Sequence, residues 1–244
     1  MKALILAGGH GTRLRPVTKV VNKHLLPIWD KPMILYGIEA LRDAGIKHII
    51  ISLSYVNPYG FMELLGDGSE YGVHISYLYQ REVRGIAWGI NEAHHWIGDE
   101  SFIVYLGDNI FVDGIASIIK RFKSLVNSGT SKPLVLLKEA ETMDEARRYG
   151  VAKFQGSEVS ELVEKPSEPP SRHILLGLYC LTPKFFELFS RMKPSERGEY
   201  EITDALNLLM PVNYDVYKGI WWDCGVFKDI TEASQFMMVR GEQK

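Results

Sequence analysis

The sequence predicts an α/β protein built on a mostly parallel β-sheet flanked by helices. In the first half, short apolar runs alternate with longer stretches whose apolar residues recur at helical spacing. The apolar runs are nearly continuous, which is typical of strands covered on both faces. After residue 140 the strands become closely spaced, so we expect a mixed β region inserted into a single domain, residues 1–244.

The expected elements of the first half form strand–helix pairs. Strands are expected at 2–7, 48–53, 73–79 and 101–107. Helices, each bounded by glycine or proline, are expected at 32–45, 85–98 and 114–129. A strand, a helix and a further parallel strand form the repeating unit of this fold class. The alternation therefore places helices on both faces of the sheet.

The second half is expected to contain a hairpin and an amphipathic C-terminal segment. The strands are 132–140, a hairpin over 151–166 with a Gly-Ser turn, 174–182 and 214–219. Helices are expected at 184–192 and 229–244. Ile230, Ala233 and Met237 share one side of the second helix, which predicts that this side is buried.

The composition excludes several classes of function. A net charge of −2 argues against a general nucleic-acid binder. No stretch approaches 18 consecutive apolar residues, so no membrane partner is expected, and residues 1–7 read as a strand and not as a signal peptide. Cys180 and Cys224 lack the spacing of a disulfide or zinc framework, which predicts a reducing, cytoplasmic location.

The segment LAGGHGTRLRP, residues 6–16, predicts an anion-binding loop directly after the first strand. Glycines expose successive backbone N–H groups, Thr12 adds a hydroxyl, and Arg13 adds a planar guanidinium suited to phosphate. A dinucleotide fingerprint fails because Leu14 stands where its third glycine belongs, and the P-loop pattern fails after Gly11. Taken alone, the segment could also form a surface turn with solvated arginines.

The longer pattern resembles the sugar-1-phosphate nucleotidylyltransferases, most closely the glucose-1-phosphate thymidylyltransferases. The family signature G-G-x-G-T-R-L-x-P-x-T, followed by K-x-L-L-P, matches residues 8–18 and 23–27. Further matches along almost the whole chain are LLGDGSEYG, YQREVRGIA, LGDNIF, RYGVAKF, EKP, GLY, RGEYEITD and WWDCG. The resemblance implies a Rossmann-like sheet of the nucleotide-diphospho-sugar transferase type, with the inserted β region binding the sugar.

The resemblance also implies the activity and its cofactor. A nucleotidyl group passes from dTTP or UTP to glucose 1-phosphate, giving dTDP-glucose or UDP-glucose and pyrophosphate, with Mg²⁺ as the cofactor. The implied catalytic residues are Arg13, Lys23 and Asp108. The implied metal ligands are Asp108 and Asp223, in keeping with the preference of Mg²⁺ for carboxylate oxygens.

Two substrate-binding sets follow from the same resemblance. The implied nucleotide-binding residues are Gly8, Gly9, Gly11, Thr12, Arg13, Gln80 and Gly85. The Gln80 amide can pair with the edge of thymine or uracil, because it offers both a donor and an acceptor. The implied sugar phosphate-binding residues are Asn109, Tyr149, Gly150, Glu164, Lys165, Leu176 and Arg197.

Several alternatives stay open at the level of sequence. Another sugar 1-phosphate, or a non-catalytic sensor of nucleotide sugars, is compatible with the fold, and a homodimer is an open possibility. Glu164 and Lys165 could form a surface charge pair, and Asp108 could cap a helix. His10 and Trp88-Gly89 depart from the residues usual in the family, which leaves the nucleotide preference undecided.

The C-terminal segment leads to one further expectation. Many thymidylyltransferases continue beyond the region matching Asp223 in a helical extension that helps to form an intersubunit inhibitory site. The match here stops within 229–244, so we expect a catalytic core without that particular inhibition.

Overall fold

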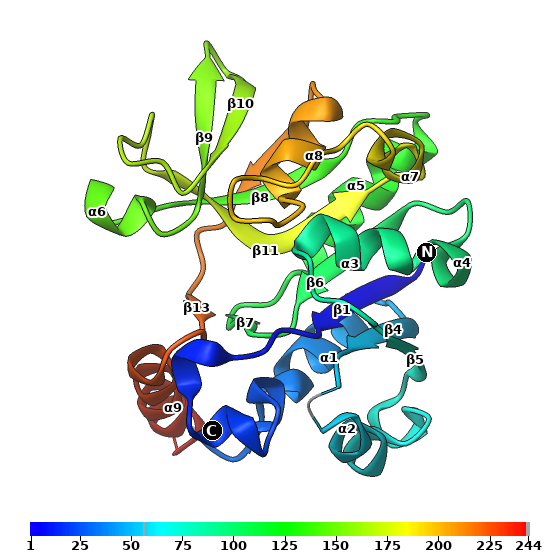
Figure 1. The fold of residues 1–244 in the computed structure, drawn as a ribbon, viewed down its shortest axis with the longest axis vertical. Coiled ribbons are helices and arrows are strands. Elements are labelled where there is room, and N and C mark those ends of the chain that lie inside the picture. Colours follow the sequence, from blue (N-terminus) through cyan, green and yellow to red (C-terminus); the bar gives the residue numbers. More distant parts are fainter. Residues whose placement is uncertain (56, 243–244) are drawn as a thin grey trace. The chain divides into compact units, whose positions relative to one another are not determined.

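The computed structural model describes residues 1–55 and 57–242 (Figure 1). The chain divides into two compact units. Unit 1 contains Met1–Lys2, Arg84–Val104 and Ser117–Lys218, and unit 2 contains Ala3–Val83, Tyr105–Ala116 and Gly219–Lys244. Strand β6 (Phe102–Leu106) begins in unit 1 and ends in unit 2. The chain thus passes between the units several times, and the single domain stays a prediction.

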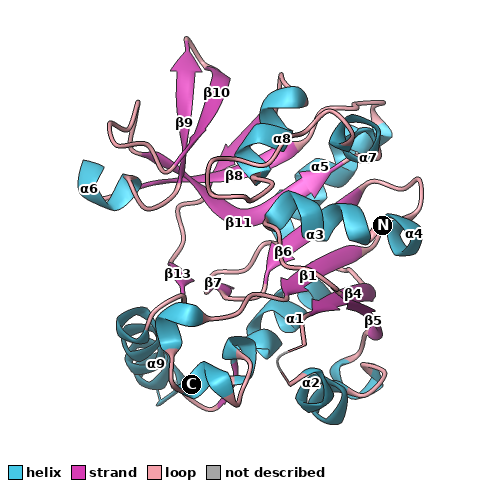
Figure 2. Ribbon diagram, viewed as in Figure 1, coloured by secondary structure: helices cyan, strands magenta, loops and turns pink. Residues whose placement is uncertain are grey.

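Unit 2 contains three neighbouring parallel strands. These are β1 (Ala3–Ala7), β4 (His48–Leu53) and β5 (His74–Tyr79), with β4 in the middle (Figure 2). Helix α1 (Met33–Asp43) lies between β1 and β4 in the chain, and α2 (Pro58–Leu65) lies between β4 and β5. The strand–helix alternation expected from the sequence is confirmed here. The fully buried β1 residues Ala3, Leu4 and Ile5 show why this strand reads as continuously apolar.

Short elements complete unit 2. Three 3₁₀ helices follow β1, namely η1 (Thr12–Leu14), η2 (Val17–Lys19) and η3 (Lys23–Leu25), and η4 (Ser69–Tyr71) precedes β5. Two antiparallel pairs are β2 (Pro27–Ile28) with β3 (Lys31–Pro32), and β7 (Asn109–Phe111) with β13 (Trp221–Asp223).

Helix α9 (Phe227–Glu242) is the last element of unit 2, and it buries the side that the sequence analysis predicted. Ala233 is fully buried in a cluster with Ile28, Met33, Tyr36, Ile110 and Cys224, and Ile230 and Met237 pack against this cluster. The predicted apolar side of this helix is therefore confirmed. The last two residues of the predicted range, 243–244, lie outside the described residues.

Unit 1 carries the mixed β region. Its strands are β8 (Leu134–Glu139), β9 (Gly150–Gln155), β10 (Glu158–Glu164), β11 (His173–Leu181) and β12 (Asn213–Val216). The β9–β10 hairpin (Figure 1, green) is antiparallel, β11 pairs antiparallel with β8 and β9, and β12 pairs parallel with β8. The predicted hairpin with its turn at Gly156-Ser157 is thus confirmed.

The helices of unit 1 differ from the expected ranges at 85–98, where one helix was expected and two are found. They are α3 (Ile86–Glu92), α4 (His94–Ile97), α5 (Ala116–Asn127), α6 (Met143–Ala146), α7 (Lys184–Phe189) and α8 (Ile202–Leu208). The single helix expected over 85–98 is two helices, because the N–H of Ala93 bonds to the carbonyl of Ile90 and so tightens the turn. Within the described part of the chain, no helix combines the length and the apolar character needed to cross a membrane.

Candidate active site

The glycine-rich loop of unit 2 forms a tight turn after β1. Gly11 adopts a left-handed conformation with a φ of 58° and precedes η1. The hydroxyl of Thr18 donates a 2.7 Å hydrogen bond to the carbonyl of Gly11, and the N–H of Leu14 bonds to the same carbonyl at 2.9 Å. Leu14 itself is fully buried and anchors the turn in the core. The sequence puts glycine where this backbone conformation requires it.

Gln80 lies against this loop. It follows β5, and its N–H donates a 2.7 Å hydrogen bond to the carbonyl of Leu53. Its side chain is buried and packs over Gly8, where an added Cβ would lie 2.0 Å from the Gln80 Oε1. Unit 2 therefore brings together Gln80 and the glycine loop, two predicted parts of the nucleotide site that are distant in sequence.

Lys23 and Asp108 form an ion pair in unit 2. Lys23 opens η3, which is capped by the side chain of Asn22, and Asp108 directly follows β6. The Nζ of Lys23 contacts the Oδ2 of Asp108, and both side chains are only 13% exposed. The amide of Asn109 donates a 3.1 Å hydrogen bond to the Asp108 Oδ1. Burial alone would raise the pKa of Asp108, but Lys23 and these hydrogen bonds hold that pKa well below its usual range.

His24, the residue after Lys23, belongs to a hydrogen-bond network that holds this part of the chain in place. It is almost completely buried, and its Nδ1 lies 2.7 Å from the Oδ1 of Asn22. Burial, aided by Lys23, lowers the pKa of His24 to about 3, so the ring is neutral at physiological pH. Its Nδ1–H therefore donates to Asn22, whose amide in turn donates a 3.2 Å bond to the carbonyl of Ala7. This network fixes the backbone that carries Lys23 to the end of β1.

Asp223 brings a second carboxylate to the same place. It ends β13 and pairs in register with Asn109, while the N–H of Cys224 donates a 2.9 Å bond to the carbonyl of Asp108. Burial, together with the charge of Asp108, raises the pKa of Asp223 to about 6, although Lys23 and Arg13 oppose the shift. One carboxylate is thus firmly ionised, and the other holds a proton up to about pH 6.

Arg13 approaches Asp223 through a gap left by a glycine. An added Cβ at Gly225 would lie 2.6 Å from the Nη2 of Arg13, so the guanidinium packs directly on the Gly225 backbone. A side chain at position 225 would displace the guanidinium from this place. Unit 2 therefore gathers two cations, Arg13 and Lys23, around two carboxylates, Asp108 and Asp223.

The two carboxylates suit a magnesium ion. Among the described residues there is no cluster of three His, Cys, Asp or Glu side chains able to hold a metal. Mg²⁺ does not need one, because it commonly takes one or two protein carboxylates and fills its shell with phosphate oxygens and water. Asp223 pairs in register with Asn109, the residue that follows Asp108, and after burial the charge of Asp108 contributes to the raised pKa of Asp223. A cation held by both carboxylates would relieve this repulsion.

Unit 1 gathers a second set of charged side chains at the end of β10. Glu164 pairs in register with Gly150 across the hairpin. Its carboxylate accepts a 3.3 Å hydrogen bond from the Thr203 hydroxyl and lies 3.5 Å from both the Lys165 Nζ and the Arg197 Nη2. Burial raises the pKa of Glu164, and the nearby Glu201 adds to the rise, whereas Lys165 and Arg197 oppose it.

Arg197 is held mainly by Glu201. Its Nη2 and Nε donate hydrogen bonds of 2.7 Å and 3.2 Å to the Glu201 Oε1, and the hydroxyl of Ser195 donates to the same oxygen at 2.8 Å. Glu201 is buried, so these bonds neutralise a charge that would otherwise be costly.

The other predicted sugar-site residues also lie in unit 1, apart from Asn109. The carbonyl of Tyr149 accepts a 3.1 Å bond from the N–H of Lys165. An added Cβ at Gly150 would lie 2.8 Å from the Thr203 Cγ2, which explains the glycine. Leu176 is fully buried inside β11. Asn109 belongs to unit 2, where its amide contacts Asp108 and accepts a 2.8 Å bond from the Trp221 indole.

Comparison with known proteins identifies the family. The family model for nucleotidyl transferase matches residues 2–239. The chain belongs to the nucleotidyl transferase family. It is 38% identical to the low-salt glycan biosynthesis nucleotidyltransferase Agl11 of Haloferax volcanii, over 98% of this chain and 66% of that protein. It is 36% identical to a glucose-1-phosphate thymidylyltransferase of Streptomyces griseus, over 100% of this chain and 68% of that protein. The chain thus spans about two thirds of the length of these relatives.

Solved structures of other nucleotidyl transferases share the fold. A Bacillus anthracis protein provisionally assigned as a glucose-1-phosphate thymidylyltransferase, in complex with a sucrose, matches with a TM-score of 0.89 and 36% identity. The match covers 97% of this chain and 94% of that chain. A UDP-glucose pyrophosphorylase complexed with UDP-glucose matches with a TM-score of 0.85 and 29% identity, over 98% of both chains. The predicted fold class and family resemblance are confirmed.

Several residues that contact the predicted site residues were not singled out by the sequence analysis. They are Asn22, His24, Ser195, Glu201, Thr203 and Gly225. Each lies within or beside a matched motif, as Gly225 does in WWDCG and Thr203 in RGEYEITD. Their position in or beside a motif could have drawn attention to them. Their roles, however, depend on contacts with residues that are remote in sequence.

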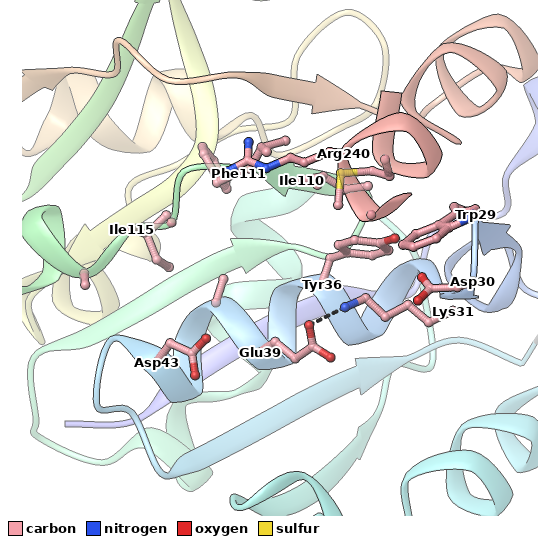
Figure 3. Close-up of a pocket in the computed structure, with 16 residues that line it drawn as sticks. Trp29, Asp30, Lys31, Tyr36, Glu39, Asp43, Ile110, Phe111, Ile115 and Arg240 are labelled. Atoms are coloured by element: carbon pink, nitrogen blue, oxygen red, sulfur yellow. Dashed lines mark hydrogen bonds and ion pairs between the residues drawn. The ribbon is translucent and has the colours of Figure 1, made fainter. Parts of the chain in front are cut away.

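Unit 2 of this nucleotidyl transferase also contains a cavity of about 440 Å³ between α1 and the end of α9 (Figure 3). Lys31 forms an ion pair with Glu39 on its wall and lies 4.4 Å from the centre of the Tyr36 ring. Trp29 and Arg240 also line the cavity. None of the described residues predicted for the active site lines it.

Proposed function

We propose that the chain transfers a nucleotidyl group from dTTP or UTP to glucose 1-phosphate and releases pyrophosphate. The Lys23–Asp108 ion pair, with Asp223 and Arg13 beside it, is the observation that carries this proposal. The names of the relatives support it, because they include glucose-1-phosphate thymidylyltransferases and a UDP-glucose pyrophosphorylase.

The reaction makes limited chemical demands on the protein. A phosphate oxygen of glucose 1-phosphate forms a bond to the α-phosphorus, and the bond between that phosphorus and the bridging α–β oxygen breaks. The electron pair of the broken bond leaves with pyrophosphate. The attacking oxygen is already anionic, so no general base is required. Catalysis then rests on alignment of the two phosphates and on neutralisation of their charge.

The charged residues of unit 2 meet these demands. The N–H groups of the glycine loop and the Arg13 guanidinium bind the triphosphate and then the departing pyrophosphate. Lys23 neutralises charge at the reacting phosphates. Asp108 and Asp223 would hold Mg²⁺, which when bound supplies further neutralisation of phosphate charge. Asn109 orients Asp108 through its 3.1 Å hydrogen bond, in addition to its predicted role toward the sugar phosphate.

Binding of the base and of the sugar phosphate completes the proposal. Gln80 selects a pyrimidine through its amide, and Gly85 belongs to the same nucleotide set. In unit 1, Glu164 accepts hydrogen bonds from sugar hydroxyls, and Lys165 and Arg197 bind the sugar phosphate. Tyr149, Gly150 and Leu176 shape that part of the site. The proposal includes a cytoplasmic location, which the free thiols of Cys180 and Cys224 support.

A pyrophosphate-release assay tests the proposed function. Purified protein with Mg²⁺ is offered dTTP, UTP, ATP and GTP, each with glucose 1-phosphate and with several other sugar 1-phosphates. We expect turnover with a pyrimidine triphosphate and glucose 1-phosphate. Equal use of ATP or GTP would refute the role of Gln80. Tight binding of nucleotide sugars without any turnover would instead support a sensor.

A further inference from the structure

Within unit 1, the segment that carries Arg197 is bound to the turn that contains Gly85. The N–H of Tyr200 donates a 2.7 Å hydrogen bond to the carbonyl of Arg84. The N–H of Ala87 donates a 3.1 Å bond to the carbonyl of Tyr200. The backbone three residues after Arg197 is therefore fixed to both sides of Gly85.

The fit between these two segments is close. Gly85 has a φ of 99°, and an added Cβ would lie 2.7 Å from the Tyr200 carbonyl oxygen and 2.8 Å from its nitrogen. Both neighbouring atoms belong to the backbone, so neither can rotate away as a flexible side chain could. A shift of one segment must therefore move the other.

Aromatic rings strengthen the contact. The centre of the Trp88 ring, in the first turn of α3, lies 5.4 Å from the centre of the Tyr200 ring. The ring of Phe189, the last residue of α7, lies 5.3 Å from the same Tyr200 ring, centre to centre. The Arg84 guanidinium lies 5.0 Å from the centre of the Trp88 ring. The buried indole N–H of Trp88 has no hydrogen-bond partner among the described residues, so ring packing sets its orientation.

We propose that Trp88 and Tyr200 are a positioning pair that couples nucleotide binding to sugar phosphate binding. This inference rests on the proposed function, which assigns Gly85 to the nucleotide and Arg197 to the sugar phosphate. A nucleotide that orders the Gly85 turn also orders Tyr200, and with it the adjacent Glu201 that holds Arg197. Arg197 is then in place before the sugar phosphate arrives, so less conformational entropy of Arg197 is lost when the sugar phosphate binds.

Calorimetric binding measures this coupling directly. The dissociation constant of glucose 1-phosphate is measured with Mg²⁺, alone and in the presence of saturating α,β-methylene-dTTP, which cannot release pyrophosphate. In the unmodified protein we expect the analogue to tighten glucose 1-phosphate binding about fivefold or more. By linkage, glucose 1-phosphate must tighten binding of the analogue by the same factor.

Substitutions identify the residues responsible. Tyr200→Leu and Trp88→Leu should each reduce the coupling to less than about twofold, and the double variant should lose no more than either alone. Tyr200→Phe keeps the ring and should keep the coupling. Trp88→Phe should fall between the unmodified protein and Trp88→Leu, so a graded loss is measurable even if one leucine variant folds poorly.

A structural control separates coupling from stability. Phe154→Leu removes a partly buried ring of unit 1 whose ring contacts, with His173 and Tyr214, lie outside this cluster. It should lower the melting temperature and preserve the coupling. Unchanged coupling in both leucine variants, or equal loss in Phe154→Leu, would overturn the inference. If the unmodified protein binds both ligands without coupling, the inference fails alone. If it binds neither ligand, the proposed function fails too.

Discussion

Two partly buried carboxylates, Asp108 in unit 2 and Glu164 in unit 1, each lie near a lysine, yet their pKa values shift in opposite directions. Asp108 contacts the Nζ of Lys23 directly, and its pKa falls well below the usual range despite burial. Glu164 lies 3.5 Å from both Lys165 and Arg197, and Arg197 is held more closely by Glu201. Burial therefore prevails at Glu164 and raises its pKa. Direct contact with one cation therefore lowers the pKa of a carboxylate more than two cations do when they lie farther away and are shared with a second carboxylate.

The difference suits the two proposed tasks. Unit 2 offers the fixed Lys23–Asp108 ion pair, whose charges can neutralise and align phosphates. Unit 1 offers a carboxylate that is surrounded by a hydroxyl, two cations and another carboxylate, which are donors and acceptors of the kind that bind sugar hydroxyls and a phosphate. The following predictions test this division of roles.

The largest effect is expected for Lys23→Ala. The variant removes a fixed positive charge from the reacting phosphates, so kcat should fall about 10²–10³-fold. The control is Lys47→Ala, which changes an exposed lysine of the same unit whose Nζ bonds to the carbonyl of Gly72. Melting curves with Mg²⁺ present show whether each variant is folded. Turnover of Lys23→Ala within a few-fold of the unmodified protein would remove Lys23 from the mechanism.

The metal ligands should give the next largest effect. Asp108→Asn and Asp223→Asn each weaken one carboxylate, so the Mg²⁺ concentration for half-maximal rate should rise about tenfold or more. Part of the lost activity should return at raised Mg²⁺. Titration of the rate with Mg²⁺ measures this. An unchanged Mg²⁺ dependence in either variant would assign that aspartate a structural role.

The raised pKa of Asp223 predicts a pH dependence of Mg²⁺ binding. Below about pH 6 Asp223 is protonated, so Mg²⁺ must displace a proton, and the affinity should fall by up to about tenfold per pH unit. Above that pH the affinity should be level, because Asp108 stays ionised throughout. Calorimetry between pH 5 and pH 8 tests both limbs. The slope should vanish in Asp223→Asn, and a slope that persists in this variant contradicts the assignment.

Glycines of the two units should respond differently to alanine. Gly85→Ala meets backbone atoms of Tyr200 at 2.7 Å and 2.8 Å, so we expect a loss of about 1–3 kcal/mol in the free energy of unfolding. Gly8→Ala meets the movable end of Gln80, so it should weaken nucleotide binding with a smaller loss of stability. Gly98→Ala, which has a positive φ but open space, is the control. Chemical denaturation ranks the three variants, and equal losses would refute the contact argument.

The sequence predicted the repetitive part of the fold well. The strands β4 and β11 read as apolar runs, and the buried side of α9 follows from the spacing of Ile230, Ala233 and Met237. Helix α2 was missed although Asn57 caps it and Pro58 opens it, because it has only eight residues. The break at Ala93 depends on a local change in hydrogen bonding that has no marked sequence signal.

The structure brings together residues that the sequence analysis predicted one by one for the site, and their roles stay predictions. Lys23 and Asp108 were predicted separately, and the structure pairs them. Gly85 was assigned to close approach of a nucleotide, and the structure shows close approach of the Tyr200 backbone. The roles of His24 and Thr203 depend on residues that only folding brings near, so no local pattern could reveal them.

The central claim is that unit 2 performs the chemistry and unit 1 binds the sugar phosphate, and Glu164→Gln tests it most directly. Pyrophosphate release is measured while glucose 1-phosphate and the triphosphate are varied in turn. Loss of the charged acceptor should raise KM for glucose 1-phosphate by about tenfold, leave KM for the triphosphate unchanged, and keep kcat within a few-fold. A loss of kcat as large as that of Lys23→Ala, or a raised KM for the triphosphate alone, would contradict the account.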